Sequence, residues 1–421
     1  MTNITNILAR EILDSRGNPT IEVEVVLTDN TIGRASVPSG ASTGSREAIE
    51  LRDQELRFAG KGVNYACENV RHRIKPLLLN KSCLAQRELD NLMLTLDASS
   101  NKSNLGANAI LGVSMAIATA AAKHCATPLY QYLHTTYGVA SELVMPMPMF
   151  NVINGGEHAD NNLSIQEFMI CPVGARDIMQ ALEMTHNVIS ALRKILKDQR
   201  LNTNVGDEGG FAPNLNSNAQ AIEMILQAIE LCGLDNNQVK VCLDVAASEF
   251  FINGQYELAC EHKSMNSSEF VAYLSKLCGD YNLLSIEDPL DENDWQGWQE
   301  LTQAIGSEVQ IVGDDLFVTN SQLLQKGIEL NAANAILIKM NQIGTLSETM
   351  DTIALANKHK YNCIISHRSG ETEDTFIADL AVASGVGMIK TGSLCRSDRV
   401  AKYNQLLRIY ESLYKQVKFY K

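Results

Sequence analysis

The sequence predicts an α/β protein built from an N-terminal α+β domain, residues 1–137, and a (β/α) barrel of eight-stranded type, residues 138–421. Two patterns predict this division. Near the N-terminus a strand pattern is followed by helical patterns, whereas the later part repeats a strand and a helix at a regular spacing. A chain of 421 residues is long enough for two or three domains, or for one large barrel with an attachment.

The N-terminal strand is predicted by an alternation of side chains. After the turn at 14–19, the run Ile21–Val25 alternates apolar and acidic residues, which is typical of a strand with one buried face. A Ser/Gly-rich loop follows at 38–45, and we expect it to be mobile. Helical patterns then continue to about Tyr137. We place the domain boundary in 138–148, because its two prolines disfavour helix.

Six short β-type runs in the later part each end in a polar residue. The runs are Val239–Leu243, Leu283–Ile286, Val309–Gly313, Ala335–Ile338, Cys363–Ser366 and Val386–Ile389. Successive ends are separated by 43, 27, 25, 28 and 23 residues, and a strand with its crossover helix occupies roughly 25–30 residues. The carboxyl ends of barrel strands share one face, where active sites form. We therefore expect the residues after these runs to converge on one mouth: Asp244, Glu287, Asp314, Lys339, His367 and Lys390.

Composition excludes some classes of partner. With 35 Lys+Arg against 49 Asp+Glu, the net charge of −14 disfavours a nucleic-acid binder and docking on an anionic membrane. The 10 cysteines show no CxxC pair or zinc-type spacing, so we expect them to be reduced. Residues 1–16 show no signal-peptide pattern. The uncharged stretch Leu105–Ala122 is long enough for a membrane span, but its Ala and Gly content favours a buried helix capped near Ser103 or Asn104.

Three of the expected mouth residues suggest a metal site. Asp244, Glu287 and Asp314 would form an oxygen-rich site without Cys or His, which suits Mg²⁺ better than zinc. A lysine beside a divalent cation and a second lysine should have a lowered pKa, so Lys339, next to Lys390, is a candidate general base. Lysines at strand ends more often form Schiff bases or bind phosphate, so the spacing alone is only moderately specific.

Further polar motifs complete the expected site. They are Arg368-Ser369, whose donors suit phosphate or carboxylate, the glycine-rich segment 205–210 with Glu208, the segment 154–160 with His158, and the pair Gln166-Glu167. Each alone is also consistent with a plain turn or a solvated residue. Together they describe a small anionic substrate held by a metal and cations. Abstraction of a proton α to a carboxylate fits this chemistry best.

Long strings of the sequence resemble the enolase family, the glycolytic phosphopyruvate hydratases, of the bacterial type. The similarity extends nearly end to end, for example over Arg10–Thr20, Pro38–Glu47, Asn104–Ser114, Asn154–Asn162, Val205–Asn214, Ile338–Thr349 and Ser366–Ala381. It implies a carbon–oxygen lyase that reversibly dehydrates 2-phospho-D-glycerate to phosphoenolpyruvate in glycolysis and gluconeogenesis. A Lys or His base and one or two Mg²⁺ ions are already established for this superfamily, so that part of the mechanism is not an independent prediction.

The resemblance also implies a role for each site residue. Lys339 resembles the base that removes the C2 proton, and Glu208, supported by Glu167, resembles the acid that protonates the departing C3 hydroxyl. The ligands of a tightly held Mg²⁺ would be Asp244, Glu287 and Asp314, and Ser39 would close over a second Mg²⁺. Substrate contacts would be His158, Gln166, Glu167, Lys339, Arg368, Ser369, Lys390 and His367, which also counts among the catalytic residues.

The family fold, ββαα(βα)₆, would account for the 43-residue interval and for the lack of a clean repeat before Asp244. Because members are dimers or octamers, we expect a cytoplasmic homo-oligomer, without nucleic acid or a membrane span. The alternatives are another metal-dependent lyase of the superfamily, which the Glu208 segment and Ser366–Ala381 disfavour, or a second role. Some members of the family bind plasminogen on the cell surface or after secretion, and some bind to an RNA-degradation complex, so the resemblance leaves either second role open.

Overall fold

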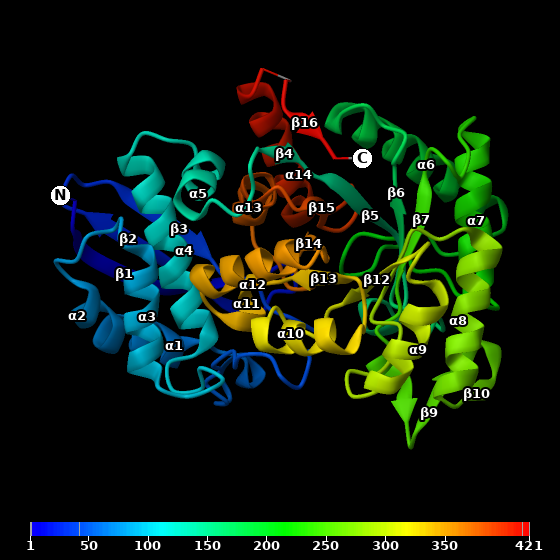
Figure 1. Ribbon diagram of the computed structural model, residues 1–421, viewed down its shortest axis with the longest axis horizontal. Coiled ribbons are helices and arrows are strands. Elements are labelled where there is room, and N and C mark those ends of the chain that lie inside the picture. The colour runs from blue at the N-terminus through cyan, green and yellow to red at the C-terminus, as the bar shows by residue number, and fades with distance from the viewer. Residues whose placement is uncertain (1, 42, 415, 421) are drawn as a thin grey trace.

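The computed structural model describes residues 2–41, 43–414 and 416–420, and Figure 1 shows its two parts side by side. The N-terminal part contains an antiparallel sheet in the order β1-β2-β3, with β1 at Ile4–Leu13, β2 at Pro19–Leu27 and β3 at Ile32–Ser36. The predicted strand therefore lies in β2. Helix α4 (Ala107–His124) packs so closely on this sheet that a Cβ at Gly33 would lie 2.2 Å from the carbonyl oxygen of Ala116.

Helix α4 is the expected buried helix, and nearly all of its side chains are buried. The expected cap was wrong: the helix begins after Gly106, whose φ of 94° favours glycine, and no side chain caps it. In the part of the chain that the structure describes, no single helix is long and apolar enough to span a membrane. Only α4 taken together with α5 (Leu129–Tyr137) passes that test, and the two helices meet at a bend of 104°.

The remaining helical segments of this part surround the sheet and α4. They are a 3₁₀ segment at Arg57–Gly60, α1 at Asn64–Asn69, a π-helical turn at Val70–Ile74, α2 at Lys75–Leu78 and α3 at Gln86–Asp97.

The larger part is a closed barrel of eight strands in the order β11-β12-β13-β14-β15-β5-β6-β7. The strands are β5 (Met147–Asn154), β6 (Glu167–Cys171), β7 (Lys240–Asp244), β11 (Ser285–Glu287), β12 (Gln310–Gly313), β13 (Ala335–Ile338), β14 (Asn362–Ser366) and β15 (Gly387–Lys390). All six predicted runs are thus barrel strands. Strand β6 runs antiparallel to both β5 and β7, and every other pairing in the ring is parallel.

The order of elements confirms the barrel type ββαα(βα)₆. After β5 and β6 come two successive helices, and each later strand is followed by a helical segment. The helices are α6 (Ile178–Asp198), α7 (Asn218–Leu231), α8 (Ser267–Tyr281), α9 (Trp295–Ile305), α10 (Ser321–Leu330), α11 (Met340–Ile343), α12 (Leu346–Lys358), α13 (Phe376–Ser384) and α14 (Ser397–Ser412). Polar caps fix several starts; at α8, Asn266 and Glu269 form a reciprocal capping box.

One explanation drawn from the sequence was wrong. The 43-residue interval does not come from the atypical first portion of the barrel, which ends before β7. It comes from a small antiparallel sheet, β8 (Phe251–Ile252), β9 (Gln255–Leu258) and β10 (Lys263–Met265), inserted between β7 and α8.

The side chain of Asp90 makes one of the contacts between the N-terminal part and the barrel. The carboxylate of Asp90, on α3, accepts hydrogen bonds from the backbone N–H of Ser347 (3.1 Å) and from its hydroxyl (2.6 Å), at the start of barrel helix α12. Near the chain end, β16 (Lys418–Phe419) pairs with β4 (Val144–Met145), beside the expected domain boundary. The division at 137/138 stays a prediction.

Candidate active site

The carboxyl ends of the parallel barrel strands surround a small polar cavity of about 20 Å³. Five of the six expected strand-end residues line it, and the sixth, Glu287, is bonded to one of them. Strand β6 places its first residue, Glu167, at the cavity rather than its last, because this strand runs in the opposite direction to its neighbours. The lining also includes the other expected residues: His158, Gln166, Glu167, Glu208, Arg368 and Ser369.

Lys390 forms the centre of a buried ion network. Its ammonium lies 2.9 Å from Asp244 Oδ2, 2.8 Å from Glu287 Oε2 and 3.2 Å from Glu167 Oε1. Burial lowers the pKa of Lys390, but the three carboxylates outweigh it and hold the pKa well above its ordinary value. Burial and the charge of Asp244 raise the pKa of Glu287, whereas Lys390 overcomes the effect of burial at Asp244 and lowers that pKa.

Lys339 is bound to Asp314 in a second ion pair. From the sequence we expect a lowered pKa at Lys339, because a bound cation would lie beside it. Without that cation, the side chains around Lys339 have the opposite net effect. Burial lowers the pKa, but the attraction of Asp314 raises it above the ordinary value. The backbone N–H of Lys339 donates to Thr319 Oγ1 (2.8 Å), and this hydroxyl donates to Gln342 Oε1 (2.9 Å). The amide of Gln342 in turn donates to Asp314 Oδ1 (2.8 Å), which fixes that carboxylate.

Glu167 and Glu208 form a buried acidic pair bordered by two histidines. His158 Nδ1 lies 3.5 Å from Glu167 and 3.8 Å from Glu208, and His367 Nε2 lies 3.1 Å from Glu208 Oε2. Burial and the charge of Glu208 raise the pKa of Glu167 well above its ordinary value. Burial also raises the pKa of Glu208, but His367 and His158 outweigh this effect, so the pKa of Glu208 lies well below its ordinary value. The two groups titrate as a coupled pair, and their surroundings shift the two pKa values in opposite directions.

Arg368 and Ser369, expected to contact phosphate, are held by the Ser/Gly-rich loop. Arg368 Nη1 and Nη2 donate to the two carboxylate oxygens of Glu47, at 2.9 and 3.1 Å. Burial lowers the pKa of Arg368, while Glu47 raises it, and the net shift is upward. The hydroxyl of Ser369 accepts a hydrogen bond from the backbone N–H of Ala41 (2.6 Å). These contacts connect the loop, and Glu47 just after it, to the segment that follows β14.

Ser39 lies at the base of the same loop, paired with Gly370 through two backbone hydrogen bonds of 2.8 Å. Its hydroxyl donates to Glu50 Oε2 (3.0 Å) and accepts from Arg52 Nη2 (2.8 Å). The serine thus lies beside the segment that follows β14, but its hydroxyl is already engaged by Glu50 and Arg52. Its part in holding a second cation stays a prediction.

The donors at the mouth fit a hard divalent cation. Among the described residues, two groups place their ligand atoms within 4.8 Å of one another: Asp288, Asp314 and Asp315, and His158, Glu167 and Glu208. The first group offers only carboxylate oxygens. Buried atoms without a hydrogen-bond partner in this part of the chain include Gln166 Oε1 and Glu167 Oε2. The expected triad of ligands is bridged by Lys390 between Asp244 and Glu287, so these side chains would have to exchange an ammonium for a metal.

Sequence reasoning missed several residues of this site. Asp288 accepts hydrogen bonds from the backbone N–H groups of Asp314 and Asp315, both at 2.8 Å, and so shapes the end of β12. Glu47 and Gln342 hold Arg368 and Asp314, as described above. Asp288 directly follows the expected residue Glu287, and Glu47 and Gln342 lie inside sequence strings that resemble the family. Their positions in the sequence could therefore have marked them as candidates.

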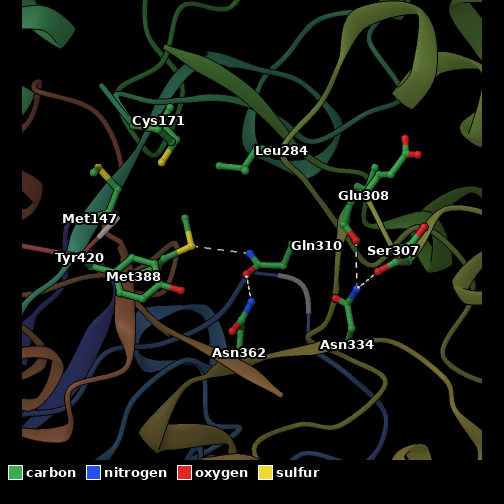
Figure 2. A pocket seen from close by; sticks show the side chains of 13 residues that line it. Met147, Cys171, Leu284, Ser307, Glu308, Gln310, Asn334, Asn362, Met388 and Tyr420 are labelled. Atoms are coloured by element: carbon green, nitrogen blue, oxygen red, sulfur yellow. Dashed lines mark hydrogen bonds between the residues drawn. The ribbon is translucent and has the colours of Figure 1, made fainter. Parts of the chain in front are cut away.

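A second, larger cavity of about 340 Å³ lies at the opposite end of the barrel, around the first residues of the parallel strands (Figure 2). Its lining includes the side chains of Met147, Cys171, Leu284, Met388 and Tyr420. The side-chain amides there already have partners: Asn362 donates to Gln310 Oε1 (3.0 Å), and Asn334 donates to the backbone carbonyl oxygens of Gly306 and Val309. The cavity lacks the converging charges of the mouth, so we place the active site at the smaller cavity.

Two family models match the chain. The model described as "Enolase, N-terminal domain" matches residues 4–133, and the one described as "Enolase, C-terminal TIM barrel domain" matches residues 142–421. Both matches agree with the α+β part and the barrel that the structure shows. Because they cover nearly the whole chain, the protein belongs to the enolase family.

Proposed function

We propose that the protein reversibly dehydrates 2-phospho-D-glycerate to phosphoenolpyruvate. The observation that carries this proposal is the placement of the two proton-transfer groups. Lys339 follows β13 and Glu167 begins β6, and these strands are four places apart in the eight-strand ring. A base and an acid pair thus face the mouth from opposite walls. Removal of a proton from C2 and protonation of the hydroxyl on C3 need two such groups.

Lys339 is the proposed base for the C2 proton. Glu208 is the group that protonates the departing C3 hydroxyl, and Glu167, whose pKa burial and the charge of Glu208 raise, supports it. The donors of Arg368 and Ser369 suit the substrate phosphate, which must displace Glu47 from Arg368. Gln166, His158 and His367 line the same cavity and contact the substrate in this proposal.

Asp244, Glu287 and Asp314 are the residues that would hold a tightly bound Mg²⁺, with Ser39 near a second one. Bound Mg²⁺ supplies positive charge that neutralises the negative charge building up on the substrate carboxylate when the C2 proton leaves. Lys390 and Lys339, which balance these acids in the structure, keep the site assembled.

The test is the Mg²⁺-dependent appearance of enolpyruvate absorbance from 2-phosphoglycerate. Absence of turnover with folded protein and Mg²⁺ would contradict the proposal and favour a binding role or another lyase activity. The base is tested separately with Lys339→Ala, which should abolish exchange of the C2 proton with solvent. Retained exchange in that variant would overturn the assignment of Lys339. Sizing in solution tests the expected dimer or octamer.

A further inference from the structure

Arg399 is a buried arginine that neither the expected site nor the proposed mechanism uses. It lies in the first turn of α14, and its side chain is fully buried. Its guanidinium holds two segments of the mouth. Nη2 donates to the carbonyl oxygens of Ser369 (2.7 Å) and Asp207 (3.2 Å), and Nη1 donates to that of Arg368 (2.5 Å). The residue before Glu208 and the residues after His367 are therefore fastened to one side chain.

The same guanidinium faces the ring of His367. Nη1 of Arg399 lies 2.6 Å from Nδ1 of His367. An arginine side chain has donors only and keeps its charge, so Nδ1 must present its lone pair to it. The ring proton then sits on Nε2, the atom that lies 3.1 Å from Glu208 Oε2. A second proton on the ring would point at the guanidinium, so this contact also disfavours the imidazolium.

The other charges around His367 are consistent with a neutral ring. Burial is the main cause that lowers its pKa to about 4, Glu208 opposes this, and Arg399 reinforces it. The carboxylate of Glu371 acts more weakly and is itself bound to Lys402 Nζ at 2.8 Å. Asp398 is bound to Nε of Arg399 at 2.8 Å.

We propose that Arg399 is a positioning residue: it holds His367 neutral, with its proton on Nε2, the ring atom that lies 3.1 Å from Glu208 Oε2, and ties the Glu208 segment to the His367 segment. The inference deepens the proposed function and rests on it for its catalytic consequence. Protonation of the leaving hydroxyl by Glu208 depends on this arrangement, whereas abstraction of the C2 proton by Lys339, on the opposite wall, does not.

The experiment compares Arg399→Lys with a matched control, Lys402→Met. Lys402 lies one turn further along α14, is equally buried, and contacts Glu371 and the carbonyl of Thr372 rather than His367. The first readout is the ¹⁵N spectrum of the full-length protein with labelled histidine, in which His367→Gln identifies the signals of His367. We expect one ring proton, on Nε2, in the unchanged protein and in Lys402→Met. In Arg399→Lys the signals should shift towards the other tautomer or the imidazolium.

The second readout is kinetic. Arg399→Lys should slow dehydration by about 10–100-fold, by analogy with the loss that follows removal of a hydrogen-bond partner of a metal-ligating histidine, while C2 exchange changes much less. In a His367→Gln background the same substitution should slow dehydration less. Glutamine has no tautomers, so Arg399 has no ring proton to place in that variant. Unchanged ¹⁵N signals in Arg399→Lys, or an equal shift in Lys402→Met, would overturn the inference. The spectra need no substrate, so absent turnover in the unchanged protein would count against the proposed function alone.

Discussion

Replacing Lys390 by methionine tests whether the buried ion network holds the barrel mouth together. The substitution keeps an unbranched apolar stem of the same length and removes the ammonium that lies within 3.2 Å of Glu167 and within 2.9 Å of Asp244 and Glu287. Removing one partner of a buried ion pair costs about 3–5 kcal/mol, because the other charge stays buried and uncompensated. With three carboxylates around Lys390, we expect a loss in the upper part of that range.

The assay is urea unfolding in the presence of a chelator, so that metal binding does not add to the stability of the folded state. Lys418→Met is the matched control. Lys418 is bound to Glu142 at the same distance, 2.9 Å, but both side chains are more than half exposed. An exposed pair contributes about 0–1 kcal/mol. Fluorescence and circular dichroism should be recorded together, because a chain of this size need not unfold in one step.

The pH dependence gives a second check. Glu167 and Glu287 have folded-state pKa values above the ordinary value of 4.5. The folded state therefore binds more protons than the unfolded state, and the unfolding free energy falls as pH rises above that value. Without Lys390 these pKa values rise further, so the loss in Lys390→Met should grow from acidic to neutral pH. A loss within about 1 kcal/mol of that in Lys418→Met at neutral pH would refute the reasoning.

Three other predictions follow from the structure. Glu208→Gln should lose dehydration while keeping some C2 exchange, since the two proton steps use separate groups; equal loss of both would place Glu208 in the first step or in the fold. Burial raises the pKa of Asp379 from its ordinary value of 3.8 to about 7. Because the folded state then holds this proton more tightly than the unfolded state, the unfolding free energy should fall as the pH rises from about 3.8 to about 7. Asp379→Asn should remove this slope and stabilise the protein near neutral pH by at most about 4 kcal/mol, measured by urea unfolding; an unchanged slope would contradict it. Asp90→Ala, which deletes the acceptor for Ser347, should cost about 1–3 kcal/mol in the same measurement, and an unchanged unfolding free energy would contradict a stabilising role for these hydrogen bonds.

The positions of the strand ends could be predicted because buried parallel strands appear as continuous apolar runs. Each of the six runs that precede Asp244 to Lys390 is a barrel strand. The direction of β6 could not be predicted in the same way. All five of its residues are buried, so its pattern is the same whichever way the strand runs.

The hydrogen-bond and ion-pair partners of the site residues could not be predicted from the sequence either. Apolar periodicity does not say which acid a lysine meets, and the raised pKa of Lys339 depends on its contact with Asp314. The same holds for Arg399, whose role comes from four contacts with segments 30 and more residues away. The cap of α4 was missed for a local reason: Gly106 adopts a conformation with positive φ, and two nearby residues had the side chains of better caps.

The seam between β5 and β15 has a consequence for how the chain folds. These strands lie at residues 147–154 and 387–390, and the ring closes only when they pair. Contacts between such distant segments form slowly, because a long loop has to be closed first. The last barrel strand to be synthesised also carries Lys390, the counter-charge for acids on three other strands. Until it docks, the open barrel has both an unpaired strand edge and a group of uncompensated carboxylates, so ring closure and charge neutralisation are a single event.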